Sequence, residues 1–172
     1  NKNQKLERYL MHDLFLDPEG LFRLNKTLVN LGLDPIMESD FLNADTLAGF
    51  ELVSDSLRQV DYMPADYIEA HLTAALEFEE NPNSSDSKYT ITKEKRDQHE
   101  IRAVVRMRLN RLEDRLDEIK FLQSDELESR TYTDEEVQVL YLELLQKRRL
   151  LDKALLAPEA GGSTRVRRTS SI

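Results

Sequence analysis

Residues 93–128 read KEKRDQHEIRAVVRMRLNRLEDRLDEIKFLQSDELE and contain neither glycine nor proline. Apolar residues in this stretch recur at steps of four and three, the spacing of one narrow helix face. They are Val105, Leu109, Leu112, Leu116, Ile119 and Leu122. The spacing predicts a long helix with a coiled-coil-like seam, about 54 Å in length at about 1.5 Å per residue.

A second helix with a matching seam is predicted after a break at 129–132. Thr133 and Glu136 have the spacing of a capping box, and Pro158 is expected to end the helix. Its seam consists of Val137, Leu140, Leu144 and Leu151, with Tyr141, Leu145 and Leu155 on a flanking line. Two helices with matched seams and a short connection predict an antiparallel helical hairpin.

Residues 1–80 are predicted to form a compact bundle of four or five short helices. The expected start and stop signals are Asp17 before Pro18, Gly32, Asn43 and Pro64. The third helix has an apolar stripe at Leu47, Phe50, Val53, Leu57 and Val60, and the fourth has one at Ile68, Leu72, Ala75 and Leu76.

The chain is therefore expected to be all-α, a compact bundle followed by a long helix and a C-terminal hairpin. The predicted divisions are a bundle at 1–80, a polar linker at 81–91, the long helix and hairpin at 92–157, and a disordered basic tail at 158–172. The linker carries the polar run NPNSSDSKYT, in which Tyr89 is the one apolar residue.

The net charge of −9 is concentrated in residues 1–91, which hold seven basic and seventeen acidic residues. Such an acidic half would be repelled by phosphate backbones, so strong direct nucleic-acid binding is not expected. The sequence has no apolar run long enough to span a membrane and no secretory leader, and its lack of cysteine fits a cytoplasmic protein. Because the chain begins Asn1-Lys2-Asn3, we expect it to be a fragment of a larger protein.

No motif for catalysis, cofactor binding or metal binding stands out. The three histidines, His12, His71 and His99, have no histidine or cysteine three or four residues away. A metal site on helices needs such pairs on one face. Acidic and basic residues alternate along 111–120 in the manner of a solvated helix surface. We therefore expect no catalytic, cofactor-binding or metal-binding residues in this chain.

Two stretches resemble the C-terminal helicase-binding region of bacterial replicative DNA primase. The first, 6–53, contains four of that family's features in order, namely the leucine-rich helix pattern from Glu7 to Phe15, Asp17-Pro18-Glu19, Asp40-Phe41 and Gly49-Phe50. The second, 100–155, is similar to the family's terminal hairpin, with an arginine- and leucine-rich helix, a polar break and a leucine- and arginine-rich end.

The resemblance implies a protein-interaction domain that recruits primase to the hexameric replicative helicase, for primer synthesis in DNA replication. The hairpin would dock on the helicase N-terminal domains. The zinc and magnesium of the family would belong to upstream domains, and this chain would make no primers. We expect the partner-binding residues to lie at the hairpin tip or beside the main seam, at Tyr132, Tyr141, Leu145 and Arg148.

Three alternatives stay open. The helical bundle also resembles the N-terminal domain of a replicative helicase, and a chain of that kind would oligomerise. The chain also fits an unrelated helical adaptor. A helical nucleic-acid binder would use the arginines between 102 and 115, which are Arg102, Arg106, Arg108, Arg111 and Arg115.

Overall fold

The computed structural model describes residues 2–73, 76, 93–124 and 133–160. These residues form six α-helices and one short 3-10 turn, and they contain no strand. The elements are α1 (Lys2–Leu16), α2 (Gly20–Asn30), η1 (Glu38–Asp40), α3 (Ala44–Arg58), α4 (Pro64–His71), α5 (Lys93–Ser124) and α6 (Asp134–Ala160). The predicted all-α class is confirmed. The predicted linker at 81–91 lies outside the described residues.

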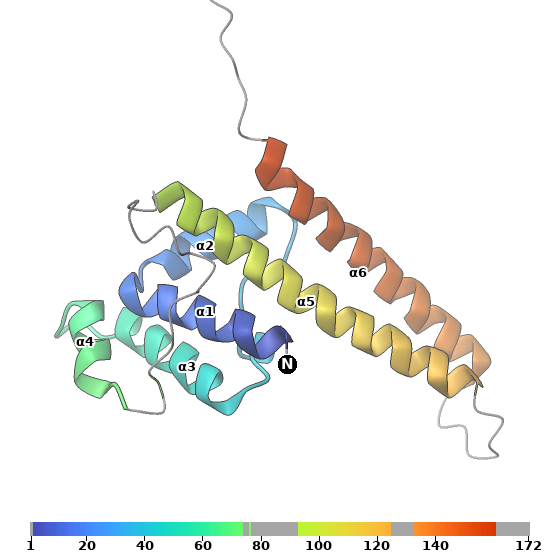
Figure 1. Ribbon diagram of the computed structural model, residues 1–172, viewed down its shortest axis with the longest axis horizontal. Coiled ribbons are helices and arrows are strands. Elements are labelled where there is room, and N and C mark those ends of the chain that lie inside the picture. The colour runs from blue at the N-terminus through green and yellow to red at the C-terminus, as the bar shows by residue number, and fades with distance from the viewer. Residues whose placement is uncertain (1, 74–75, 77–92, 125–132, 161–172) are drawn as a thin grey trace, which may run out of the picture.

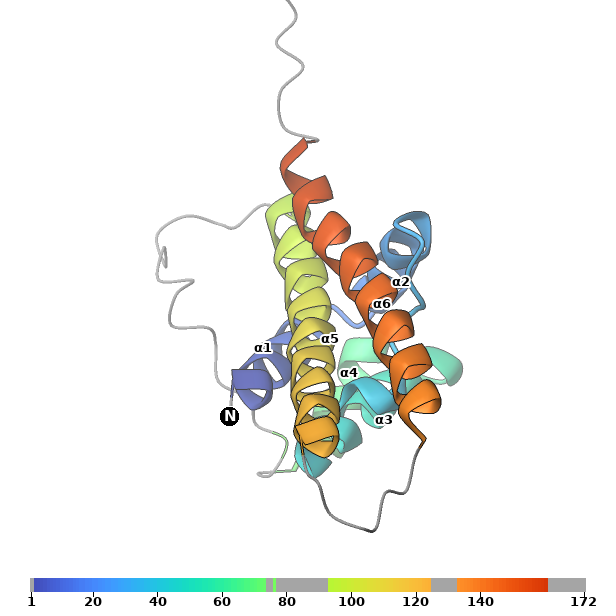
Figure 2. The same cartoon turned by 90° about the vertical axis from the view of Figure 1, so that its right-hand side faces the viewer.

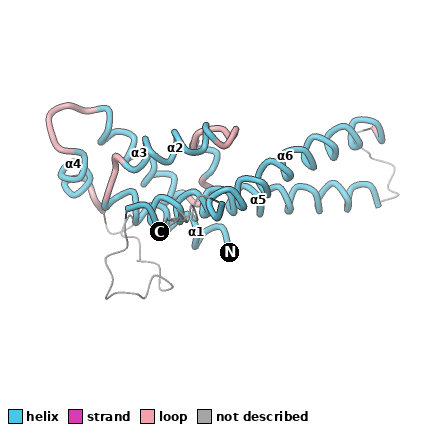
Figure 3. Tube along the Cα trace, turned by 90° about the horizontal axis from the view of Figure 1, so that it is seen from above, coloured by secondary structure: helices cyan, strands magenta, loops and turns pink. Residues whose placement is uncertain are grey.

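The long helix α5 is the central element of the molecule. Helices α1 and α6 lie on opposite sides of it (Figure 2), and α2 also packs against it. Beyond the bundle, α5 and α6 continue side by side as a projecting hairpin (Figure 1). The same projection is evident from above (Figure 3).

The bundle core is built from both ends of the chain. Leu10, Leu14 and Leu28 are fully buried together with Val104 and Val105 of α5. Leu151 and Ala154 near the end of α6 belong to the same cluster. The expected division between 1–80 and 92–157 therefore crosses one continuous core. A chain cut at residue 80 would lose the apolar face of α5 that closes the bundle.

Several predicted helix ends are confirmed. Gly32 has a φ of +76°, and the Leu33 N–H donates to the Leu28 carbonyl at 2.9 Å, which ends α2. The Asn43 side chain accepts hydrogen bonds from the backbone N–H groups of Asp45 and Thr46 at the start of α3. Pro64 is the first residue of α4.

The carboxylate of Glu7 ties α1 to the start of α3. Glu7 is 1% exposed, and it accepts hydrogen bonds from the backbone N–H groups of Leu42 and Asn43 and from the Thr46 hydroxyl. These donors lie at a helix N-terminus, where a negative charge is stabilised. The first helix is thus positioned by polar contacts as well as by its leucines.

Three predicted boundaries are wrong. Asp17 does not cap α2 with its side chain, because that carboxylate accepts a hydrogen bond from Arg23 at 2.6 Å. Val60 is 93% exposed, because α3 ends at Arg58 before the stripe reaches it. Helix α4 ends at His71, so its stripe stops at Ile68, although Leu76 is buried in the core.

Helix α6 also runs past its predicted end. It continues through Pro158 to Ala160, so residues 158–160 are helical and do not belong to a disordered tail. The fixed φ of proline is compatible with a helix, and its missing backbone N–H removes one hydrogen bond from the ladder there. Residues 161–172 lie outside the described residues.

Leu151 offers a direct test of the shared core. Replacing it by alanine is expected to lower the free energy of unfolding by about 2 kcal/mol, because the side chain is 6% exposed and joins α6 to the bundle. Leu142→Ala on the same helix is the matched control, since Leu142 is 59% exposed. Urea denaturation of both variants checks this, and equal effects would contradict a core that includes α6.

Candidate protein-docking site

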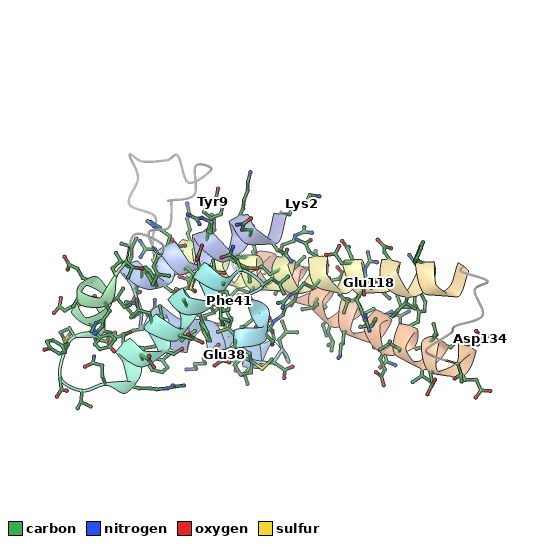
Figure 4. The ribbon with its side chains drawn as sticks, turned by 90° about the horizontal axis from the view of Figure 1, so that it is seen from below. Lys2, Tyr9, Glu38, Phe41, Glu118 and Asp134 are labelled. Carbon is green, nitrogen blue, oxygen red and sulfur yellow. The ribbon has the colours of Figure 1, made fainter. Side chains whose placement is uncertain are left out.

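The projecting hairpin has its own small apolar cluster. Leu112, Leu116 and Ile119 of α5 are buried against Leu144 of α6. The N-terminus of α6 is fixed by the predicted capping box, in which the Thr133 N–H donates to Glu136 Oε2 at 2.8 Å. These hydrogen bonds from Thr133 also lower the pKa of Glu136. Figure 4 shows Glu118 on the projecting part of α5 and Asp134 at the far end of α6.

The four predicted contact residues have different surroundings. Tyr141 and Leu145 are half-buried and pack against the hairpin's own cluster. Arg148 follows them on the same flank and forms ion pairs with Glu113 at 3.5 Å and Asp152 at 3.8 Å. Tyr132 lies outside the residues that the structure describes. The structure therefore brings three of the four together along one flank, where two contribute to internal packing.

A different surface of α6 carries exposed apolar side chains. Val139, Leu142 and Leu150 are 58%, 59% and 49% exposed. With Gln146, Arg149 and Lys153 they recur at helical spacing on the side of α6 away from its buried seam, and we call these six residues the outer α6 face. Its two charged members are both basic. Such exposed apolar residues in one row are typical of a protein-interaction surface.

The sequence does contain a signal for this face. Leucine and valine occur on both sides of the second hairpin helix, so the helix has a second apolar row beyond the seam. A helix that packs against one partner helix needs a single apolar stripe. The second row is therefore not needed for the hairpin itself and is left for another contact.

A carboxylate in η1 anchors the bundle to α5 at the root of the hairpin. Asp40 is 4% exposed and binds Arg108 Nη2 and Arg111 Nη2, each at 2.7 Å. Arg108 also donates to the carbonyl oxygens of Asp34 and Pro35, and Arg111 donates to that of Ser39. Burial by itself would raise the pKa of Asp40, but hydrogen bonds and charges from Arg108, the Met37 N–H and Arg111 hold it below the ordinary value.

Next to this ion-pair cluster lies a furrow of about 440 Å³ between α5, α6 and residues 32–37. We call it the root furrow. Its apolar walls include Leu33, Met37, Leu112 and Leu150, and its basic side chains are Arg108, Arg111, Arg115 and Lys147. Leu150 belongs both to this furrow and to the outer α6 face.

The contacts of Arg108 and Arg111 weaken the nucleic-acid alternative. Both guanidinium groups are largely buried and bound to Asp40, with 13% and 23% of their side chains exposed. Arg115 pairs with Glu118 at 2.7 Å. Two of the five arginines in that alternative therefore serve the internal contact between η1 and α5.

Within the described part of the chain, no group of three histidine or acidic side chains is placed to hold a metal ion. None of the described helices combines the length and the apolar character that crossing a membrane requires. Comparison with known proteins found no matching family model, no matching curated protein and no matching solved structure.

Proposed function

We propose that this chain is a protein-docking domain whose α5–α6 hairpin binds the N-terminal domain of a bacterial replicative helicase. In this proposal it is the C-terminal region of a DNA primase, acts in the cytoplasm, and recruits priming activity located in other domains. The observation that carries the proposal is the outer α6 face, with Val139, Leu142 and Leu150 exposed in one row.

The geometry favours helix-to-helix docking. The first half of the outer α6 face, at Val139 and Leu142, lies on the projecting part of the hairpin, where a helical partner could approach without meeting the bundle (Figure 1). Burying large aliphatic side chains in a partner's groove contributes about 1.5–3 kcal/mol for each side chain. Arg149 and Lys153 would add attraction to an acidic rim on that partner.

The choice of helicase as partner depends on the sequence resemblance at 6–53 and 100–155. The arrangement of a bundle followed by a projecting hairpin is compatible with that resemblance. An unrelated helical adaptor would use the same kind of surface on another partner. The binding partner is therefore the point that an experiment must decide.

The double variant Val139→Asp with Leu142→Asp tests the proposal. We expect this variant to bind the hexameric replicative helicase of the same organism at least about tenfold more weakly than the unchanged chain, because two apolar contacts are replaced by charges. Both positions are exposed, so the variant should keep its helical circular dichroism and its unfolding midpoint. Binding is measured by co-elution in gel filtration and by titration calorimetry.

The matched control places the same kind of charge on exposed apolar residues of the bundle, as Leu16→Asp with Val60→Asp. These side chains are 61% and 93% exposed, and this control should bind as the unchanged chain does. If the unchanged chain fails to co-elute with the helicase, the proposed partner is wrong. Self-association of the chain into rings would instead favour a helicase N-terminal domain.

Deletion of the whole hairpin is a poorer test than point substitution. Removing 124–157 would also remove Leu151 and Ala154, which pack in the bundle core. Loss of binding could then result from loss of folding. The outer-face variant avoids this ambiguity because its residues lie on the solvent side of α6.

A further inference from the structure

We propose that the root furrow binds an acidic amphipathic helix of a second protein. This inference goes beyond the helicase contact, because the furrow lies at the base of the hairpin and shares only Leu150 with the outer α6 face. The proposal follows from the shape of the furrow, its apolar walls and its charge.

The shape suits a helix. The furrow is lined by residues of two packed helices, α5 and α6, and by residues between 32 and 37. Its volume of about 440 Å³ gives room for apolar side chains of a helix laid across it. Met37 and Leu150 at its walls are 45% and 49% exposed, so apolar surface is available to a partner. An amphipathic helix would place its apolar face against these side chains.

The charge of the furrow specifies an acidic partner. Four basic side chains line it, while Asp34 and Asp40 are its acidic residues. Asp40 is already paired with two arginines. Arg115 and Lys147 are the more exposed basic groups, one from each helix. Arg115 also pairs with Glu118, which is itself 60% exposed. In a chain with a net charge of −9, this positive site would attract carboxylates and disfavour basic partners.

The furrow is also held in place before any partner arrives. The segment 32–37 that lines it is fixed to α5 by Arg108, which donates to the carbonyl oxygens of Asp34 and Pro35 at 2.7 and 2.8 Å. Arg111 and Asp40 fix the following turn. A preformed site requires less ordering on binding, which favours affinity.

A protein partner fits this site better than a nucleic acid. Among the described residues no aromatic side chain lines the furrow, so these residues offer bases no stacking surface. A phosphate backbone is charged and polar, so it would make no favourable apolar contact with Leu33, Leu112 and Leu150 in the furrow.

The test uses a fluorescein-labelled synthetic peptide of about 18 residues, long enough to form a helix on binding. It carries leucine at helical i, i+3, i+4 spacing and glutamate elsewhere, and a matched peptide has lysine in place of glutamate. Fluorescence anisotropy with the full chain is expected to show binding of the glutamate peptide and at least about tenfold weaker binding of the lysine peptide.

Two charge-reversal variants locate the site. Arg115→Glu combined with Lys147→Glu should weaken binding of the glutamate peptide at least about tenfold and leave helicase co-elution unchanged. The control is Lys120→Glu, at an exposed residue of α5 outside the furrow. It should change the affinity for the glutamate peptide less than about twofold. Equal affinity for both peptides, or an equal loss in the control, would overturn the proposal. Tighter binding of a single-stranded DNA oligonucleotide at the same residues would also overturn it.

Discussion

Replacement of Asp40 by alanine is expected to lower the free energy of unfolding by about 3–5 kcal/mol. The carboxylate is 4% exposed, and its two oxygens accept hydrogen bonds from Arg108, from Arg111 and from the Met37 N–H. Without it, two largely buried guanidinium groups lose their counter-charge. An unpaired buried charge costs much more than an intact pair contributes.

Urea denaturation at neutral pH measures this effect. The control is Asp117→Ala, whose carboxylate pairs with Lys120 at 3.5 Å but is 76% exposed. That variant should lose less than about 1 kcal/mol, because exposed ion pairs contribute little. If Asp40→Ala is as stable as the control, the cluster does not anchor η1 to α5.

Acid should reproduce part of the Asp40→Ala effect. Because the folded chain holds the pKa of Asp40 below its ordinary value, the ion pairs stabilise the fold at neutral pH. That stabilisation is present above the unfolded pKa and is lost as the pH falls through the folded pKa. Below about pH 4, the free energy of unfolding of Asp40→Ala should therefore fall less steeply with decreasing pH than that of the unchanged chain.

Replacement of Glu100 by glutamine is expected to stabilise the chain at alkaline pH. Glu100 is 2% exposed, and neither of its carboxyl oxygens has a hydrogen-bond partner within the described residues. Burial raises the pKa of Glu100 to about 8, with further contributions from the charges of Asp13, Asp97 and Asp17, while Arg23 opposes the rise. Arg23 itself pairs with Asp17 and Asp97 rather than with Glu100.

The sign of the pH effect follows from proton binding. Above the unfolded pKa of Glu100 and up to about pH 8, the folded chain retains a proton that the unfolded chain has lost. Stability then falls by about 1.4 kcal/mol per pH unit as the pH rises. Glutamine removes this dependence at residue 100, since it has no proton to lose.

Unfolding measured between pH 5 and pH 8 tests this expectation. Over that interval, the free energy of unfolding of the unchanged chain should fall by about 4 kcal/mol more than that of Glu100→Gln. Glu113→Gln, an exposed glutamate on the same helix, is the control and should follow the unchanged chain. Parallel pH profiles for Glu100→Gln and the unchanged chain would show that the buried carboxyl is already ionised at neutral pH.

Local sequence signals predicted much of the secondary structure. The alternating spacing from Val105 to Ile119 identified the α5 seam, whose members are buried as expected. Gly32, Asn43, Pro64 and the capping box at Thr133 marked helix ends that the structure confirms. These features depend on residues within one turn of each other, so a single sequence suffices to find them.

Features that depend on long-range contacts could not be predicted. Asp17 has the position of a helix cap, but its carboxylate binds Arg23 instead. Asp40 and Arg108 are 68 residues apart, and no local pattern links them. The outer α6 face is a different case, because its second apolar row is visible in the sequence, and the fold adds that Val139, Leu142 and Leu150 stay exposed.

Hydrogen exchange of the backbone amides in the chain–helicase complex tests the docking proposal most directly. The chain is compared alone and with the N-terminal domain of the replicative helicase. The account predicts slower exchange along α6 around Val139, Leu142 and Gln146, with α3 and α4 unchanged. Slower exchange confined to α1–α4, with α6 exchanging as in the free chain, would contradict it.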